Sequence, residues 1–403
     1  MKVLIADTLL PSAAQQLREA GCEVTESPAL TDQDLPAALA QTGAQVLVVR
    51  STRVPAEAFA GDDLALVVRA GAGVNTIDVQ AASAAGVYVS NCPGRNSLAV
   101  AELAIGLLIA LDRRIPQASA DLRAGRWRKG EYSAASGLAG RTLGIFGAGR
   151  IGMAVAERAR ALGMRVVMWN RDDGLRAAIA QAGFELETEP LRLAARADAV
   201  TLHLAETDET RGIAGAAFFE ALGRDALFIN TSRSGLVDEA ALADAVSHHG
   251  VRAALDVFAS EPAGKTGDVG SPLLDLPGVI ATPHIGASTL QAQEAVADEV
   301  VRIVRTFASS GEVPNVCNVT ARSPASHLLI VRHLNRVGVL SHVFSALRVA
   351  RINVQETENI VFDGGLACIA RIAISAAPDP EVLRAIRAGS DAVLNLSLVP
   401  LGV

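Results

Sequence analysis

Three side chains with complementary chemistry, those of Arg233, Glu261 and His284, each follow a short apolar run that is typical of a β-strand. An arginine can hold a carboxylate through two parallel hydrogen bonds and polarise a neighbouring keto oxygen. A histidine in a loop can pass a proton near neutral pH, and a carboxylate beside it raises its pKa. We therefore predict that these residues form one reaction centre, of the kind that interconverts a 2-keto acid and a 2-hydroxy acid.

A glycine-rich turn lies upstream of these residues. Gly147, Gly149 and Gly152 follow an apolar strand and open a helix. In dinucleotide-binding folds the first glycine allows the tight turn, the second lets the backbone approach a pyrophosphate, and the third lets helix and strand pack closely. The N-terminus of the helix offers unpaired N–H groups to the phosphates. We predict that these glycines, with Arg150 and Ile151, bind NAD or NADP; an ordinary glycine-containing turn is the alternative.

The end of the following strand leaves the identity of the dinucleotide open. Asn170 stands where NAD-binding folds usually carry an acidic residue for the adenosine ribose, about 20 residues beyond the glycines. Arg171 comes next and could pair with the 2′-phosphate of NADP, stack on adenine or simply face solvent. We expect NAD as the cofactor, with NADP as the alternative, and no metal ion.

The elements needed to position these residues form two α/β series. Short apolar runs alternate with amphipathic segments through the first hundred residues and again from Leu143 to Ala281, a pattern typical of parallel sheets covered on both faces. We predict an α/β fold with two doubly wound parallel-sheet domains, a flavodoxin-like substrate domain (1–96 with 288–315) and a Rossmann dinucleotide domain (97–287). The strands expected in the first series are Val3–Ala6, Val46–Val49, Leu66–Arg69 and Val87–Ser90.

A third, smaller unit is predicted after a linker at 309–315. Residues 325–403 show the order strand, helix, strand, strand, helix, strand, with a turn at 363–365 between the two central strands. Asp379 and Pro380 are expected to cap the second helix. This βαββαβ order is typical of a ferredoxin-like domain.

Composition argues against several classes of protein. The net charge of −7 argues against a broad nucleic-acid-binding face, and the longest apolar stretch, Leu103–Leu111, is too short to span a bilayer. The four cysteines lie far apart without a Cys-x-x-Cys pair, which argues against a disulfide or zinc framework. We therefore expect a cytoplasmic protein that acts on small molecules, with neither a membrane nor a nucleic acid as partner.

Together these motifs resemble the D-isomer-specific 2-hydroxyacid dehydrogenase family, most closely its phosphoglycerate dehydrogenases with a C-terminal ACT domain. The resemblance spans nearly the whole chain and implies that Arg233 binds the substrate carboxylate, that Glu261 tunes the histidine, and that His284 is the acid/base. It also implies that Thr207 and Asp256 contact the cofactor, Asp256 through the nicotinamide amide. The segments that carry the resemblance are Asn91–Ser97, Ala101–Leu103, Thr231–Gly235, Leu255–Pro262 and Thr282–Thr289.

The same resemblance implies a substrate. A backbone segment would hold the carboxylate, and two arginines with an asparagine would form a cationic pocket for a phosphate; salt-bridged surface arginines are the alternative. The implied reaction is the NAD(P)-dependent oxidation of 3-phosphoglycerate to 3-phosphohydroxypyruvate by hydride transfer, the first step of L-serine biosynthesis. The alternatives are a hydroxypyruvate or glyoxylate reductase and a dinucleotide-sensing, corepressor-like binding protein. The implied substrate-binding residues are Arg50, Ser51, Arg69, Ala72, Gly73, Val74 and Asn96.

For the third unit, the resemblance to ACT domains implies an effector site. His333, Asn335 and Asn353 match the residues that contact L-serine across an ACT dimer, although Val337 stands where a proline is usual. A role in dimerisation alone is the alternative. Trp127 resembles a contact between nucleotide-binding domains, so a homodimer or homotetramer is expected.

Overall fold

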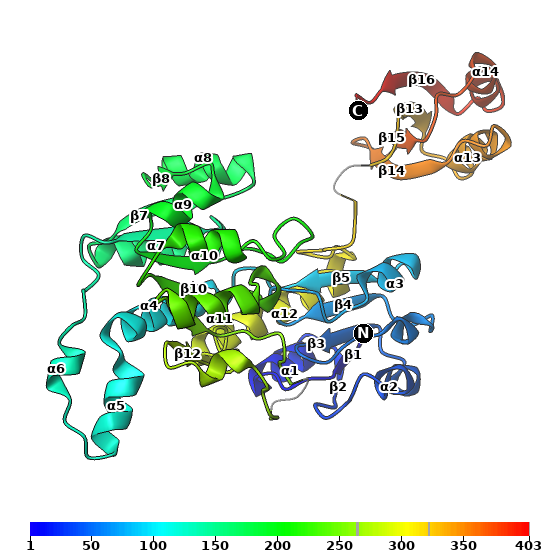
Figure 1. Ribbon diagram of the computed structural model, residues 1–403. Helices are drawn as coiled ribbons and strands as arrows, with labels where there is room; N and C mark the ends of the chain where they lie inside the picture. The colour runs from blue at the N-terminus through cyan, green and yellow to red at the C-terminus, as the bar shows by residue number, and fades with distance from the viewer. Residues whose placement is uncertain (263–265, 321–322, 403) are drawn as a thin grey trace. The chain divides into compact units, whose positions relative to one another are not determined.

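The computed structural model describes residues 1–262, 266–320 and 323–402 (Figure 1). The chain divides into two compact units, Met1–Asn318 and Val319–Val403. The first unit contains two parallel sheets, and the second contains one antiparallel sheet. The predicted fold class, two doubly wound sheets followed by a βαββαβ unit, is confirmed.

The first sheet has five parallel strands in the order β2-β1-β3-β4-β5, the flavodoxin-like order. The central strand β3 is buried on both faces, as its continuous run of Val and Leu predicts. β2 is absent from the predicted strands because its polar residues lie mostly exposed at the edge of the sheet. The strands are β1 (Lys2–Ile5), β2 (Glu23–Glu26), β3 (Val46–Val49), β4 (Leu66–Arg69) and β5 (Tyr88–Asn91).

Helices cover both faces of this sheet. On one face α1 (Pro11–Glu19) packs beside α12 (Leu290–Ser310), a helix from far along the chain, in a single apolar cluster with the strands. On the other face α2 (Leu35–Thr42) and α3 (Val79–Ala84) enclose a second cluster. Burying one Val, Leu or Ile side chain contributes roughly 1.5–3 kcal/mol, so the buried aliphatic face of α12 binds this segment firmly to the first sheet.

The second sheet has seven parallel strands in the order β12-β11-β10-β9-β6-β7-β8. The strand order reverses beside β6, and ligands of such sheets bind outside the carboxyl ends of the strands at that point. The short edge strand β8 is absent from the predicted strands. The strands are β6 (Thr142–Phe146), β7 (Arg165–Trp169), β8 (Glu185–Leu186), β9 (Ala199–Leu202), β10 (Leu227–Asn230), β11 (Arg252–Leu255) and β12 (Val279–Ala281).

Two apolar clusters hold the helices of this sheet in place. One joins α4 and α7 to one face and receives Ile179 of α8. The other, rich in phenylalanine, joins α9, α10 and α11 to the opposite face. The helices are α4 (Ser97–Arg113), α7 (Arg150–Ala161), α8 (Asp173–Gln181), α9 (Pro190–Arg196), α10 (Ala216–Leu222) and α11 (Glu239–His248).

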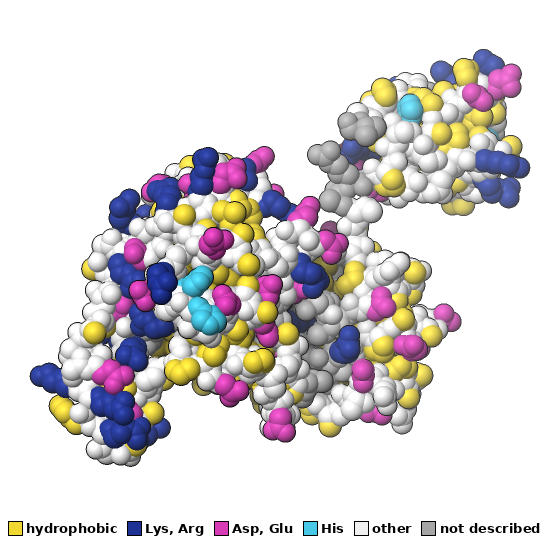
Figure 2. All heavy atoms as spheres, in the orientation of Figure 1, with side chains coloured by type: hydrophobic (Ala, Val, Ile, Leu, Met, Phe, Trp, Pro, Cys, Tyr) yellow, Lys and Arg dark blue, Asp and Glu magenta, His cyan; other side chains and the backbone are white. Residues whose placement is uncertain are grey.

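An arm made of α5 (Ile115–Arg123) and α6 (Lys129–Tyr132) extends from the second sheet of this unit (Figure 1). Trp127 on the arm is 78% exposed. The buried carboxylate of Asp121 accepts hydrogen bonds from Arg126 and from the Tyr132 hydroxyl, which fixes the turn between the two helices. Figure 2 shows Lys and Arg side chains gathered on the arm.

The C-terminal unit has the strand order β14-β15-β13-β16, with all neighbours antiparallel. Its two helices enclose one apolar cluster with the sheet. Asp379 precedes the second helix with an extended backbone, but its side chain makes no capping hydrogen bond, so the predicted cap is wrong in this respect. The elements are β13 (His327–Leu334), α13 (Val339–Val349), β14 (Val354–Val361), β15 (Ala367–Ile374), α14 (Pro380–Ala388) and β16 (Val393–Pro400).

Over the described residues, no helix combines the length and the apolar character needed to cross a membrane.

Candidate active site

His284 and Glu261 form the centre of the candidate site. Nδ1 of His284 lies 2.7 Å from Oε2 of Glu261, and Oε1 of Glu261 accepts the Phe258 N–H at 2.9 Å. The hydrogen bond to Glu261 raises the pKa of His284 more than burial lowers it. Burial alone would raise the pKa of Glu261, but the hydrogen bonds from His284 and Phe258 bring it below its usual value. The pair therefore favours imidazolium and carboxylate, and Nε2 of His284 is the nitrogen that can exchange a proton with a substrate.

The loop 282–286, called the His284 loop below, is held by a buried aspartate. Asp256 follows β11, is 1% exposed, and accepts hydrogen bonds from the Thr282 hydroxyl (2.6 Å) and from the N–H groups of Ile285 (2.9 Å) and Gly286 (2.8 Å). His284 itself has a φ of 49°. A left-handed conformation costs a non-glycine residue about 1–2 kcal/mol, and the contacts of Asp256 hold the loop in this shape. The contact of Asp256 with the nicotinamide amide stays a prediction.

Arg233 lies beside this pair. It follows β10, and its Nη1 donates to the Ser232 carbonyl at 2.6 Å. Its charge lowers the pKa of Glu261 further and opposes the effect of Glu261 on His284, so the guanidinium is near both groups. A Cβ on Gly73 would lie 2.6 Å from Nη2 of Arg233. The structure thus brings the three predicted catalytic residues together and places the Gly73 backbone against the arginine.

The backbone around Gly73 is anchored on both sides. The Ala72 carbonyl accepts a hydrogen bond from Nδ2 of Asn91 at 2.5 Å, and Val74 packs against the apolar cluster under the first sheet. The segment predicted to hold a carboxylate is therefore ordered where it faces Arg233.

Three arginines converge on the same region. Burial lowers the pKa of Arg69, and the charges of Arg233 and Arg50 lower it further. Within the described part of the chain, Nε of Arg69 and Oδ1 of Asn96 are buried polar atoms without a hydrogen-bond partner. Arg69 is partly buried with an unpartnered Nε, so the three arginines are suited to receive an anion, whereas Oδ1 of Asn96 is an acceptor and would not bind one.

The loop that carries Arg50 depends on a residue that the sequence reasoning does not assign to the site. Asp7 follows β1, and its Oδ2 accepts the N–H groups of Arg50 (2.6 Å), Ser51 (3.0 Å) and Thr52 (3.0 Å). An acidic residue at the end of an otherwise apolar first strand is the signal that could have revealed it. Residues 50–52 are called the Arg50 loop below.

The glycine turn has the geometry that a dinucleotide needs. Gly147 has a φ of 109°, and a Cβ there would lie 2.3 Å from the His203 carbonyl oxygen, so only glycine is accommodated. A Cβ on Gly152 would lie 1.9 Å from the Gly147 carbonyl oxygen, which shows how closely α7 packs on the turn. The Cβ direction of Gly149 is open, with no atom within 4 Å. The open side of the turn and the N-terminus of α7 thus form a cradle for a pyrophosphate.

Buried polar atoms at the neighbouring strand ends agree with this fit. Nδ1 of His203, after β9, and Oγ1 of Thr231, after β10, are buried without a hydrogen-bond partner in the described residues. Burial lowers the pKa of His203 to about 3, so its imidazole is neutral. Arg150 and Ile151 form the first turn of α7, and Nη1 of Arg150 donates to the Pro93 carbonyl at 2.8 Å. These residues fit a bound dinucleotide.

The other predicted cofactor residues lie on either side of the turn. Asn170 is buried, and its Oδ1 accepts the Ala148 N–H at 3.1 Å, so it supports the turn. Arg171 makes an ion pair with Glu209. The Thr207 N–H donates to the Thr210 hydroxyl at 2.8 Å, which orders the loop after β9.

The predicted effector residues do not meet within the C-terminal unit. His333 is 3% exposed and its ring nitrogens lie 2.8 Å from the Leu334 carbonyl and 3.1 Å from Oδ1 of Asn359. Asn335 donates from Nδ2 to the Gly365 carbonyl. The Asn353 N–H donates to the Ser375 hydroxyl, next to the residue that pairs with the first residue of β13. Asn353 thus lies at the opposite end of the sheet from His333 and Asn335.

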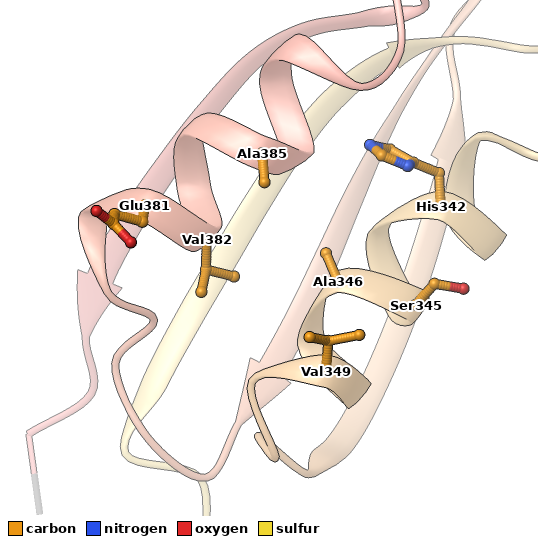
Figure 3. A pocket seen from close by; sticks show the side chains of 7 residues that line it. All are labelled: His342, Ser345, Ala346, Val349, Glu381, Val382 and Ala385. Carbon is orange, nitrogen blue, oxygen red and sulfur yellow. The ribbon is translucent and has the colours of Figure 1, made fainter.

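A cavity of about 420 Å³ lies elsewhere in this unit, between α13 and α14 (Figure 3). None of the predicted effector residues lines it. Its lining residues are His342, Ser345, Ala346, Val349, Glu381, Val382 and Ala385.

Comparisons with known proteins agree with this geometry. Residues 105–286 match the family "D-isomer specific 2-hydroxyacid dehydrogenase, NAD binding domain". The D-3-phosphoglycerate dehydrogenase of Methanocaldococcus jannaschii is 38% identical over 347 residues, which cover 84% of this chain and 64% of that protein. The chain thus spans a little under two thirds of that relative's length.

Two similar solved structures contain different dinucleotides. The NADPH-dependent glyoxylate/hydroxypyruvate reductase of Sinorhizobium meliloti, in complex with NADP and malonate, has a TM-score of 0.65 and 30% identity, with 78% of this chain and 96% of that chain covered. The NAD⁺-bound 3-phosphoglycerate dehydrogenase of Entamoeba histolytica has a TM-score of 0.64 and 25% identity, with 79% and 99% covered. The similar structures include both an NADP complex and an NAD⁺ complex.

Proposed function

The chain belongs to the D-isomer-specific 2-hydroxyacid dehydrogenase family, and we propose that it oxidises 3-phosphoglycerate to 3-phosphohydroxypyruvate, the first step of L-serine biosynthesis. The observation that carries this proposal is the cluster of Arg50, Arg69 and Arg233 beside the His284–Glu261 pair. The name of the archaeal relative supports the same substrate. A reductase of unphosphorylated keto acids would leave the partly buried Arg69 without an anion, and a dinucleotide-sensing binding protein would have no use for the proton-transfer pair.

Each residue of the site has a separate role in the proposed reaction. Arg233 and the Gly73 backbone bind the carboxylate, while Arg50 and Arg69 bind the phosphate. Nε2 of His284 accepts the proton of the C2 hydroxyl, and Glu261 stabilises the resulting imidazolium. The dinucleotide, when bound at the Gly147–Gly152 turn, supplies the acceptor for the hydride of C2. In the reverse direction His284 returns the proton to the carbonyl oxygen.

We also propose a function for each of three domains. Residues 1–96 with 288–315 form the substrate-binding domain, 97–287 the dinucleotide domain and 325–403 a regulatory ACT domain. We propose a cytoplasmic enzyme, which agrees with the buried free thiols of Cys22, Cys92 and Cys368. A homodimer or homotetramer, with the exposed Trp127 in a subunit contact, is part of the same proposal.

Steady-state kinetics with 3-phosphoglycerate and with glyoxylate test the substrate. Arg50→Ala and Arg69→Ala are expected to raise KM for 3-phosphoglycerate about tenfold or more, since each removes a charge-assisted contact. Arg53→Ala, an exposed arginine three residues from Arg50, is the matched control. Unchanged kcat/KM for 3-phosphoglycerate in Arg50→Ala would overturn the phosphate pocket, and faster turnover of glyoxylate would favour a reductase.

We further propose that L-serine binds between two copies of the C-terminal unit. Because Asn353 lies at the opposite end of the sheet from His333 and Asn335, one copy alone does not bring them together. Calorimetry with L-serine on the full chain tests this. Heat of binding that is lost in Asn353→Ala supports an effector site; no heat at millimolar serine leaves dimerisation as the role.

A further inference from the structure

We propose that Glu299, a buried carboxylate on α12, is a positioning residue for the substrate. Through Asn315 and Asn91 it holds the Ala72–Gly73 backbone, which lies against Arg233, in the place where the substrate carboxylate binds. The inference rests on the proposed function and deepens it, because it assigns the residues that fix the carboxylate-binding backbone.

Glu299 lies within α12 and is 2% exposed. Its Oε1 accepts hydrogen bonds from Nη2 of Arg302 and Nδ2 of Asn315, both at 2.6 Å. Its Oε2 accepts Nη2 of Arg95 at 2.5 Å. These hydrogen bonds, most of all that from Arg302, lower the pKa of Glu299 to about 2, so the side chain is a carboxylate. A buried carboxylate is costly unless it is paired, and Glu299 therefore binds the segments that supply its partners.

Asn315 joins Glu299 to the end of β5. Its Nδ2 donates both to Glu299 and to the Asn91 carbonyl, which lies 3.2 Å away. Asn315 has a φ of 55°, a left-handed conformation that asparagine adopts more readily than most residues. The segment around it is also fixed, because Ser90 and Val316 form an antiparallel bridge. The amide of Asn315 is thus held between α12 and β5.

The end of β5 in turn holds the backbone that faces Arg233. Nδ2 of Asn91 donates to the Ala72 carbonyl at 2.5 Å, and the N–H of the next residue donates to the Gly71 carbonyl at 2.9 Å. Two consecutive carbonyl groups are therefore bound from the side of β5. A Cβ on Gly73 would lie only 2.6 Å from Nη2 of the arginine, so a small shift of this backbone changes the space beside the guanidinium.

This chain of hydrogen bonds matters because the two groups proposed to bind the carboxylate belong to different sheets. Arg233 follows β10 of the second sheet, and the Gly73 backbone follows β4 of the first. Their separation must match a carboxylate, and a displacement of about 1 Å can cost a large factor in rate. Val300 and Val301 are buried in the apolar cluster that joins α12 to the first sheet, so their neighbour Glu299 is a fixed point for the chain.

The experiment separates this role from a purely structural one. Oxalate, a carboxylate without a phosphate, is titrated into the NADH complex of the full chain, and nucleotide fluorescence reports its Kd. KM for 3-phosphoglycerate and Tm are measured beside it. The variants are Asn315→Gly, which permits the left-handed backbone and removes the amide, Glu299→Gln, and the double variant. Arg302→Ala is the matched control, because it removes hydrogen bonds of Glu299 that lie within α12 and join no other segment.

Asn315→Gly is expected to raise the Kd of oxalate and KM for 3-phosphoglycerate about tenfold, while the Kd of NADH changes less than about twofold. Glu299→Gln should give the same loss, and the double variant should bind oxalate no more weakly than either single variant, because both act through one chain. Arg302→Ala should lower Tm and leave the Kd of oxalate unchanged. If Glu299→Gln does not fold, Asn315→Gly by itself tests the chain.

Three results would overturn the inference: no binding of oxalate to the wild type, an unchanged Kd of oxalate in Asn315→Gly, or an equal loss in Arg302→Ala and Asn315→Gly. Absence of turnover on 3-phosphoglycerate together with the expected pattern for oxalate would instead defeat the proposed function alone.

Discussion

Asp7 and Asp256 follow strands in two different sheets, and each accepts three hydrogen bonds from the loop after a neighbouring strand. Asp7, after β1, supports the Arg50 loop that follows β3. Asp256, after β11, supports the His284 loop that follows β12. In both places a buried carboxylate satisfies N–H groups that no strand partner can reach, and so presents a functional side chain at the carboxyl edge of a parallel sheet.

The two loops differ in backbone strain. Arg50, Ser51 and Thr52 are all described by the structure, and none has a positive φ, whereas His284 has a φ of 49°. The Arg50 loop therefore keeps an accessible conformation without Asp7, while the His284 loop is held in an unfavourable one by Asp256. We therefore expect Asp7 to affect the KM of the substrate. We expect Asp256 to affect kcat, because it orients the proton-transfer side chain of His284.

The largest effect is expected from the residue that Asp256 positions. His284→Asn removes the proton acceptor and is expected to lower kcat by about 10³-fold, within the range for general acid–base groups. Nucleotide Kd, measured by fluorescence, should stay within a factor of two or three of the wild-type value. Retained turnover would show that the His284 loop does not carry the acid/base.

Asp256→Asn is expected to lower kcat by about 10²-fold with little change in KM. The amide has one oxygen instead of two, so it must turn its NH₂ toward one of the hydrogen-bond donors of the loop, and a displacement of about 1 Å has this order of effect. Steady-state kinetics measure this fall in kcat, and thermal unfolding checks that the variant is folded. Asp244→Asn, an exposed aspartate on α11, is the control. A rise in KM with unchanged kcat would contradict the role of Asp256 in aiming His284.

Glu261→Gln is expected to shift the pH profile and to lower kcat about tenfold. Oxidation needs neutral His284, so its rate should rise with pH through a pKa that the hydrogen bond to Glu261 holds above its ordinary value. Removing the carboxylate charge lowers that pKa, so the rising limb moves to lower pH. Reduction needs the imidazolium, and its falling limb should move the same way. An unmoved limb in both directions would mean that Glu261 does not tune His284.

The smallest effect is expected from Asp7→Asn. Its loop is unstrained, and the amide oxygen can still accept some of the three N–H groups, so kcat should be unchanged while KM for 3-phosphoglycerate rises a few-fold. The same kinetic assay measures it beside Arg50→Ala. A fall in kcat as large as that of Asp256→Asn would remove the distinction between the two loops.

The sequence was sufficient for the fold class because buried parallel strands are continuous apolar runs, and β3 and β4 were predicted with their observed bounds. β2 and β8 were missed because they are short edge strands with polar residues, which local pattern does not separate from loops. The helices of the arm were also not predicted, since an exposed helix leaves a weaker apolar pattern.

For the candidate site, the residue types and their positions after strands were enough to name Arg233, Glu261 and His284 and the glycine turn. Both signals can be recognised from a short stretch of sequence. The chemistry of a side chain depends on its residue type, and a turn that only glycine accommodates depends on a few neighbouring residues. Which groups meet was decided by the tertiary structure. The contacts of Asp7 span 43–45 residues and those of Asp256 span 26–30, and they exist only because strand order and register bring the ends of separate strands to one edge of each sheet. Strand order and register also place Glu209 opposite Arg171 and separate Asn353 from His333.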